Sequence, residues 1–113
     1  MPQLKMSEKN GFTIIALKGQ FIGGDETDQL RATLSELGEK PEPKILLDMD
    51  SVSYLNSTAL SVLISAHRNV AKQNGKIALC NIGKTIENVF VQTKLVLVFS
   101  IYSTIEDAIK ELA

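Results

Sequence analysis

The sequence predicts a single α/β domain in which two strands are followed by alternating helices and strands, in the order ββαβαβαβα. Short apolar segments alternate with longer segments whose apolar residues recur every three or four positions. An Asn-Gly dipeptide near the N-terminus is typical of a tight hairpin turn. Helices between strands require crossover connections, so we expect a mixed, largely parallel sheet of four to five strands flanked by helices.

The first two strands form the predicted hairpin. Leu4 and Met6 alternate with polar residues, and Asn10-Gly11 then provides the turn into an apolar strand over residues 12–17. The strand turns back after the dipeptide, so this pair is the antiparallel part of the sheet.

The first helix is expected to follow the Gly23-Gly24 break, with Asp25 as its N-cap. Gly38 is placed to end it. The apolar face of this helix consists of Leu30, Leu34 and Leu37.

The next strand, at residues 45–47, is apolar throughout, which is typical of a strand covered on both faces. A polar loop is expected over residues 48–56, and a helix over 57–73 that ends at Asn74-Gly75. Leu63 and Ile64 are expected in the core. The apolar stripe of the helix consists of Leu60, Leu63, Ile64, Val70 and Ala71.

The C-terminal third continues the alternation. Residues 77–80 are expected to form a buried strand that ends in Cys80, and residues 95–101 to contain the last strand. Between them, Ile86, Val89 and Phe90 predict a third helix. Ser103 and Glu106 have the spacing of a capping box for a final helix, whose apolar positions are Ile105, Ala108, Ile109 and Leu112.

Composition excludes several classes of protein. Of the 113 residues, 44% are hydrophobic and 22% charged, and the formal net charge is −1, so we expect no direct binding of nucleic acid or of an anionic membrane. The single cysteine, Cys80, allows no internal disulfide. No apolar run has the length of a membrane span, and the first ten residues do not resemble a signal peptide. We therefore expect a cytoplasmic protein.

The segment from Asp48 to Leu60 carries the strongest functional signal, because hydroxyl side chains stand where the second helix begins. The ordinary interpretation of Asn56, Ser57 and Thr58 is helix capping. The functional interpretation is a phosphoacceptor or anion site, because a helix N-terminus offers free backbone donors and the positive end of the helix dipole.

The sequence LLDMDSVSYLNSTAL at residues 46–60 resembles the signature of the anti-sigma factor antagonists, the small STAS domains. In that family, a strand ending in Asp leads through VSYMDS(S/T)GLG into a helix. The opening hairpin, the order of helices and the length agree as well, so residues 1–113 are identified as one STAS domain.

The resemblance implies a bacterial partner-switching protein that acts in transcription regulation and stress response. In such modules the unphosphorylated form binds an anti-sigma factor that is also a serine kinase, which releases a sigma factor. Phosphorylation of one serine, here Ser57, prevents the binding, and a serine phosphatase reverses it. The family implies a monomer or weak dimer without cofactors. The partner-binding residues that it implies are Gly24, Asp25, Asn56, Ser57, Thr58 and Ala59.

Three departures from the family pattern favour an alternative, a STAS interaction or scaffold module that is not phosphorylated. The Asp of the motif is Asn56 here, which removes a charge beside Ser57, and the Gly of the motif is Ala59. The family's GELD after the second strand is replaced by the residues 19–22, GQFI, followed by Gly-Gly-Asp.

Nothing in the sequence predicts an enzyme, a metal site or a cofactor. Gly83-Lys84-Thr85 imitates the end of a phosphate-binding loop, but Ala78 stands where that motif requires glycine. The pair Asp48 and Asp50 has no further metal ligands nearby in sequence. His67, the single histidine, is expected to be an ordinary helix residue.

Overall fold

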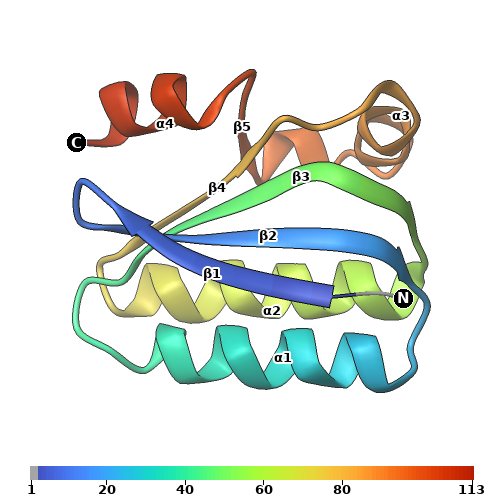
Figure 1. The fold of residues 1–113 in the computed structure, drawn as a ribbon, viewed down its shortest axis with the longest axis horizontal. Coiled ribbons are helices and arrows are strands. Elements are labelled where there is room, and N and C mark those ends of the chain that lie inside the picture. The colour runs from blue at the N-terminus through green and yellow to red at the C-terminus, as the bar shows by residue number, and fades with distance from the viewer. Residues whose placement is uncertain (1–2) are drawn as a thin grey trace.

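The computed structural model describes residues 3–113 and confirms the predicted fold class, with a five-stranded sheet and four helices (Figure 1). In chain order the elements are β1 (Gln3–Lys9), β2 (Phe12–Phe21), α1 (Asp25–Gly38), β3 (Lys44–Leu55), α2 (Ser57–Lys72), β4 (Lys76–Cys80), α3 (Lys84–Gln92), the 3-10 turn η1 (Leu95–Leu97), β5 (Ser100–Tyr102) and α4 (Ile105–Leu112).

The strands lie in the order β1-β2-β3-β4-β5, and only the β1–β2 pair is antiparallel. The hairpin turn is the predicted one: Asn10 and Gly11 have φ of 53° and 85°, as a tight turn of this kind requires. Helices α1 and α2 cover one face of the sheet and α4 the other (Figure 1). None of the helices in residues 3–113 combines the length and apolar character needed to cross a bilayer.

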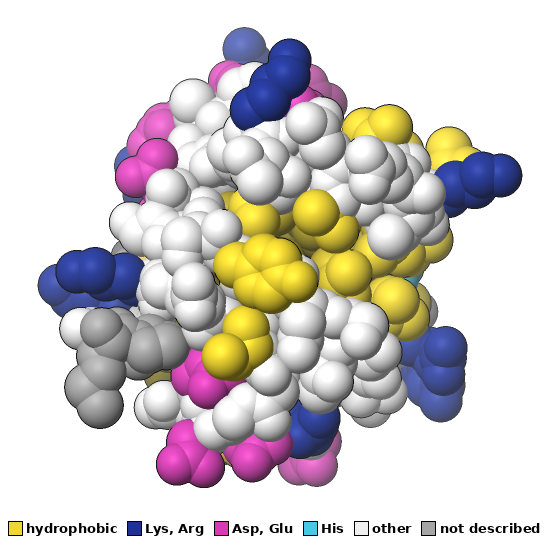
Figure 2. All heavy atoms as spheres, turned by 90° about the vertical axis from the view of Figure 1, so that its right-hand side faces the viewer, with side chains coloured by type: hydrophobic (Ala, Val, Ile, Leu, Met, Phe, Trp, Pro, Cys, Tyr) yellow, Lys and Arg dark blue, Asp and Glu magenta, His cyan; other side chains and the backbone are white. Residues whose placement is uncertain are grey.

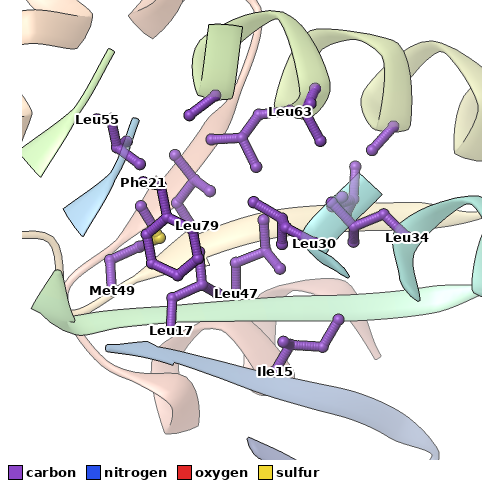
Figure 3. Packing of buried hydrophobic residues seen from close by; sticks show 14 of the residues in the cluster. Ile15, Leu17, Phe21, Leu30, Leu34, Leu47, Met49, Leu55, Leu63 and Leu79 are labelled. Atoms are coloured by element: carbon purple, nitrogen blue, oxygen red, sulfur yellow. The ribbon is translucent and has the colours of Figure 1, made fainter. Parts of the chain in front are cut away.

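Two clusters of buried side chains hold the layers together. The larger lies between the sheet and helices α1 and α2, and Figure 3 shows Leu30, Leu34 and Leu63 of these helices facing the strands. The smaller lies under α4 and contains Leu46 and Cys80. Leu47 belongs to the larger cluster, so adjacent residues of β3 supply both cores, as expected for a strand covered on both faces.

The predicted polar loop at residues 48–56 is wrong, because β3 continues to Leu55 and stays paired with β2 as far as Phe21. Met49, Val52 and Leu55 are buried, while the polar residues between them lie on the exposed side. The second half of β3 is therefore a strand with one face exposed to solvent. Its polar composition resembles that of a loop, so the sequence does not indicate a strand there. β2 likewise extends past the predicted residue 17.

The buried stripe of α2 is rotated from the predicted one. Leu60, Leu63 and Val70 are buried as expected, but Ile64 is half-buried and Ala71 exposed. The small side chains Ala59 and Ala66 are buried on the face that contacts the sheet and α1. Small residues allow the helix to approach the sheet closely. The predicted stripe was centred on the large apolar residues and left out these alanines, so it is displaced around the helix.

The predicted N-caps of α1 and α4 are each wrong by one residue. Gly24, not Asp25, is the N-cap of α1, and its carbonyl accepts the N–H groups of Thr27 and Asp28 at 3.0 Å each. The N-cap of α4 is Thr104, whose hydroxyl accepts the N–H of Asp107 at 3.0 Å, so Ser103 and Glu106 form no capping box. The last strand is shorter than the predicted apolar run, because residues 95–97 form η1.

Candidate functional site

The junction between β3 and α2 is built around Asn56. Its N–H donates to the carbonyl of Phe21 at 3.1 Å, which ties the junction to the end of β2. Its side-chain Oδ1 accepts the N–H of Ala59 at 3.0 Å, and its carbonyl accepts that of Leu60. Asn56 therefore caps α2, as its extended backbone and short polar side chain allow.

Because Asn56 performs the capping, neither hydroxyl of the predicted site is needed for it. Ser57 and Thr58 are the first two residues of α2, and both are exposed. Ala59, which the resemblance includes among the partner-binding residues, has its methyl fully buried in the larger core cluster. The accessible surface of this turn thus consists of Ser57 and Thr58, with Asn56 half-buried behind them.

The loop between β2 and α1 packs against this junction. Gly23 has φ of +92°, and a methyl group added to it would lie 3.6 Å from Asn56 Nδ2 and from Thr58 Cβ. Gly24 and Asp25 follow directly and are exposed. The structure therefore brings together the two segments, far apart in sequence, that the resemblance predicts as one partner surface.

Two further residues hold the loop in place. The Glu26 carboxylate accepts the N–H groups of Ile22 at 2.8 Å and Gly24 at 3.0 Å, and the hydroxyl of Thr27 at 2.7 Å. The buried Thr27 hydroxyl accepts the N–H of Gly23 at 2.9 Å. Neither residue stands out in the sequence as functional. The one feature that could indicate the role of Glu26 is its place as an acidic residue in the first turn of a helix whose N-cap, a glycine, has no side chain to bind the free N–H groups.

The hydrogen bond from Thr27, with those from the backbone N–H groups of Ile22 and Gly24, lowers the pKa of Glu26 from 4.5 to about 2. A carboxyl whose pKa is lower in the folded state stabilises the fold above its unfolded pKa, and this contribution is lost as pH falls from 4.5 toward 2. We expect Glu26→Gln to lose less stability over this pH range than the wild type, as measured by urea unfolding at several pH values. Glu36→Gln, on the exposed surface of the same helix, controls for loss of a carboxylate; equal pH profiles for wild type and Glu26→Gln would contradict the expectation.

The other candidate residues do not converge on Ser57. Asp48 accepts hydrogen bonds from Asn81 Nδ2 at 3.0 Å and from the N–H of Asp50 at 3.2 Å, which is a structural role between β3 and the end of β4. No cluster of three or more metal-ligating side chains occurs within residues 3–113. His67 packs edge-on against Phe99, with ring centroids 5.3 Å apart. Burial raises the pKa of the Cys80 thiol to about 11, which leaves it a poor nucleophile.

Comparison with known proteins finds matches over nearly the whole chain. The model of the family described as the STAS domain matches residues 3–108. A curated protein of Bordetella bronchiseptica, BtrV, described as a candidate anti-sigma factor antagonist, is 24% identical over 106 residues, which cover 94% of this chain and 90% of BtrV.

Solved structures share the fold at lower identity. An anti-sigma factor antagonist from Mycobacterium paratuberculosis has a TM-score of 0.86 at 19% identity, covering 99% of this chain and 94% of that one. The Bacillus cell fate determinant SpoIIAA in its phosphorylated form has a TM-score of 0.72 at 22% identity, covering 100% of both chains. The STAS domain of a SulP transporter from Vibrio cholerae also has a TM-score of 0.72, at 16% identity over 90% of this chain and 80% of that domain.

Proposed function

Because the chain belongs to the STAS domain family, we propose that it is an anti-sigma factor antagonist of the bacterial cytoplasm, which binds a kinase-type anti-sigma factor and is switched by phosphorylation of Ser57. The observation that carries the proposal is the exposed Ser57 hydroxyl at the first residue of α2, beside the β2–α1 loop and not used as a cap. A kinase reaches such a hydroxyl without unfolding the domain.

The proposed switch acts through charge. The kinase transfers the γ-phosphoryl group of ATP to Ser57 Oγ, which loses its proton, and a serine phosphatase later hydrolyses the ester. The phosphate adds roughly −1.5 to −2 charge and three acceptor oxygens. No acidic residue stands in the first turn of α2, so the phosphate would be the main charge there.

The protein itself tolerates that charge, because a helix N-terminus stabilises an anion. The fold is therefore expected to stay intact. Phosphorylation lowers the affinity for the partner instead, because a bulky anion replaces the serine hydroxyl in the contact surface. Gly24, Asp25, Asn56 and Thr58 complete the proposed contact surface, while Ala59 supports it from the core.

A second candidate function is an interaction or scaffold module that is not phosphorylated. The neutral Asn56 beside the serine favours it, since the family pattern has a carboxylate there. The transporter STAS domain shows that this fold also occurs outside anti-sigma factor antagonists. The two candidates differ in whether Ser57 accepts a phosphoryl group.

The test is incubation with ATP and each kinase-type anti-sigma factor encoded in the same genome, followed by intact mass measurement. We expect the mass of one phosphoryl group on the wild type and on Thr58→Ala, and none on Ser57→Ala. The Thr58→Ala variant is the matched control, because it removes the adjacent exposed hydroxyl. Binding of a factor without any phosphorylation would leave the interaction module as the function.

A further inference from the structure

Seven large hydrophobic side chains are exposed within the described residues 3–113. Figure 2 views the side on which β2 and β3 end and α2 begins, and shows a band of hydrophobic side chains across the middle of this face, with charged side chains at its margins. Three exposed hydrophobic residues are consecutive in the sequence, in η1 and directly after it. We call Val96, Leu97 and Val98 the apolar face.

The most exposed of them is Leu97 in η1, at 81% of its full accessible surface. Lys94, with φ of +62°, turns the chain into η1, and Phe99, which packs on the rings of His67 and Phe90, anchors it after the turn. A short surface turn held in this way has no folding reason to be apolar at its tip. Contiguous apolar surface of this kind marks an interaction site.

A groove of about 540 Å³ lies between α2 and Val98, the residue that follows η1. Ile64 and Ala71 of α2 provide its apolar wall. Arg68 and Lys72 contribute the charged groups of the lining, and no carboxylate lines it. The groove therefore favours an occupant that is apolar at its centre and acidic at its edge.

The groove and Ser57 belong to one exposed face of α2. Ser57, Ser61, Ser65 and Arg68 are spaced three or four residues apart and are all exposed. The side chains of the three serines are small, so they leave this face of the helix open to close approach from its N-terminus to the groove. A protein that contacts Ser57 can therefore extend along α2 to the groove and η1.

We propose that the apolar face and this groove bind an apolar segment with flanking acidic residues on the same anti-sigma factor that is switched at Ser57. This inference rests on the proposed function and extends it. The apolar face supplies most of the affinity, because buried apolar anchors dominate binding energy. Arg68 and Lys72 orient the acidic flank, and an acidic partner is also the kind that a phosphate on Ser57 repels.

The first test compares Leu97→Gln with Met6→Gln by calorimetric titration against the anti-sigma factor that binds the wild type. Met6 is the matched control, because it is 56% exposed but lies in β1, away from η1 and α2. We expect Leu97→Gln to weaken binding at least about tenfold and Met6→Gln to stay within about twofold of wild type. Both variants keep the wild-type unfolding midpoint, since neither side chain is buried.

The second test reverses the charge of the groove. The double variant Arg68→Glu, Lys72→Glu is expected to bind more weakly and with a smaller dependence on salt than wild type. The double variant Lys5→Glu, Lys18→Glu changes the net charge equally at exposed positions of β1 and β2, and is expected to bind as wild type does.

The outcomes separate this inference from the proposed function. If the wild type binds none of the kinase-type factors, the proposed function fails, and the assignment of this occupant fails with it. If the wild type binds but Leu97→Gln binds as tightly, only the apolar face assignment is overturned. If sedimentation shows a wild-type dimer that Leu97→Gln dissociates while partner affinity is unchanged, the face binds a second copy and the proposal is wrong.

Discussion

Leu63→Ala is expected to lower the free energy of unfolding by about 2–5 kcal/mol, a large share of the roughly 5–15 kcal/mol typical of a small domain. Leu63 has no exposed surface and points from the middle of α2 toward the strands (Figure 3). Removing its side chain loses buried apolar surface and leaves a cavity between α2 and the sheet. The cavity cannot close fully, because the surrounding core residues hold the helix and the sheet at their present distance. Urea unfolding measures the difference.

Ile64→Ala is the control for this prediction. The two residues are adjacent on the same helix, but Ile64 is half-buried at the edge of the groove. Its truncation is expected to cost less than about 2 kcal/mol, because the lost burial is smaller. A loss below about 1 kcal/mol for Leu63→Ala would contradict the packing described for α2.

Ser57→Asp is expected to weaken binding of the anti-sigma factor, while Ser57→Ala retains it. Aspartate supplies a negative charge without the size or the full set of acceptor oxygens of a phosphate, so its effect is smaller. For the phosphate itself, a coupling of about 3 kcal/mol corresponds to more than a hundredfold in affinity. Calorimetric titration of the wild type, Ser57→Asp and Ser57→Ala measures their affinities for the anti-sigma factor. The same affinity for Ser57→Asp and Ser57→Ala would contradict the charge mechanism.

The fold could be predicted from sequence wherever apolar spacing and turn residues agree. Asn10-Gly11 fixes the hairpin, and the apolar runs at 45–47 and 77–80 mark the central strands. The second half of β3 could not be recognised, because its exposed side is polar and only every second or third residue is buried. The caps at Gly24 and Thr104 lie one residue from the predicted positions, since glycine, serine, threonine and aspartate are all favoured as N-caps and stand next to one another here.

The candidate site was predictable in part. The resemblance places Ser57 and the segment at Gly24 together, and the packing of Gly23 against Thr58 accounts for this in physical terms. The role of Glu26 could not be predicted, because it depends on backbone N–H groups that converge only in the folded loop. The exposure of Leu97 could not be predicted, because it belongs to the apolar run at residues 95–101 that predicts the last strand. In the structure residues 95–97 form η1 instead, directly after the left-handed Lys94.

The most direct test of the central claim is a titration of the anti-sigma factor with two preparations of the wild-type protein, one phosphorylated by that factor and one treated with a serine phosphatase. The dephosphorylated protein is expected to bind, and the protein that carries phosphate on Ser57 to bind more than about a hundredfold more weakly. Both preparations should unfold at closely similar urea concentrations, since the phosphate lies at an exposed helix N-terminus. Equal affinity of the two preparations would contradict the proposed switch at Ser57.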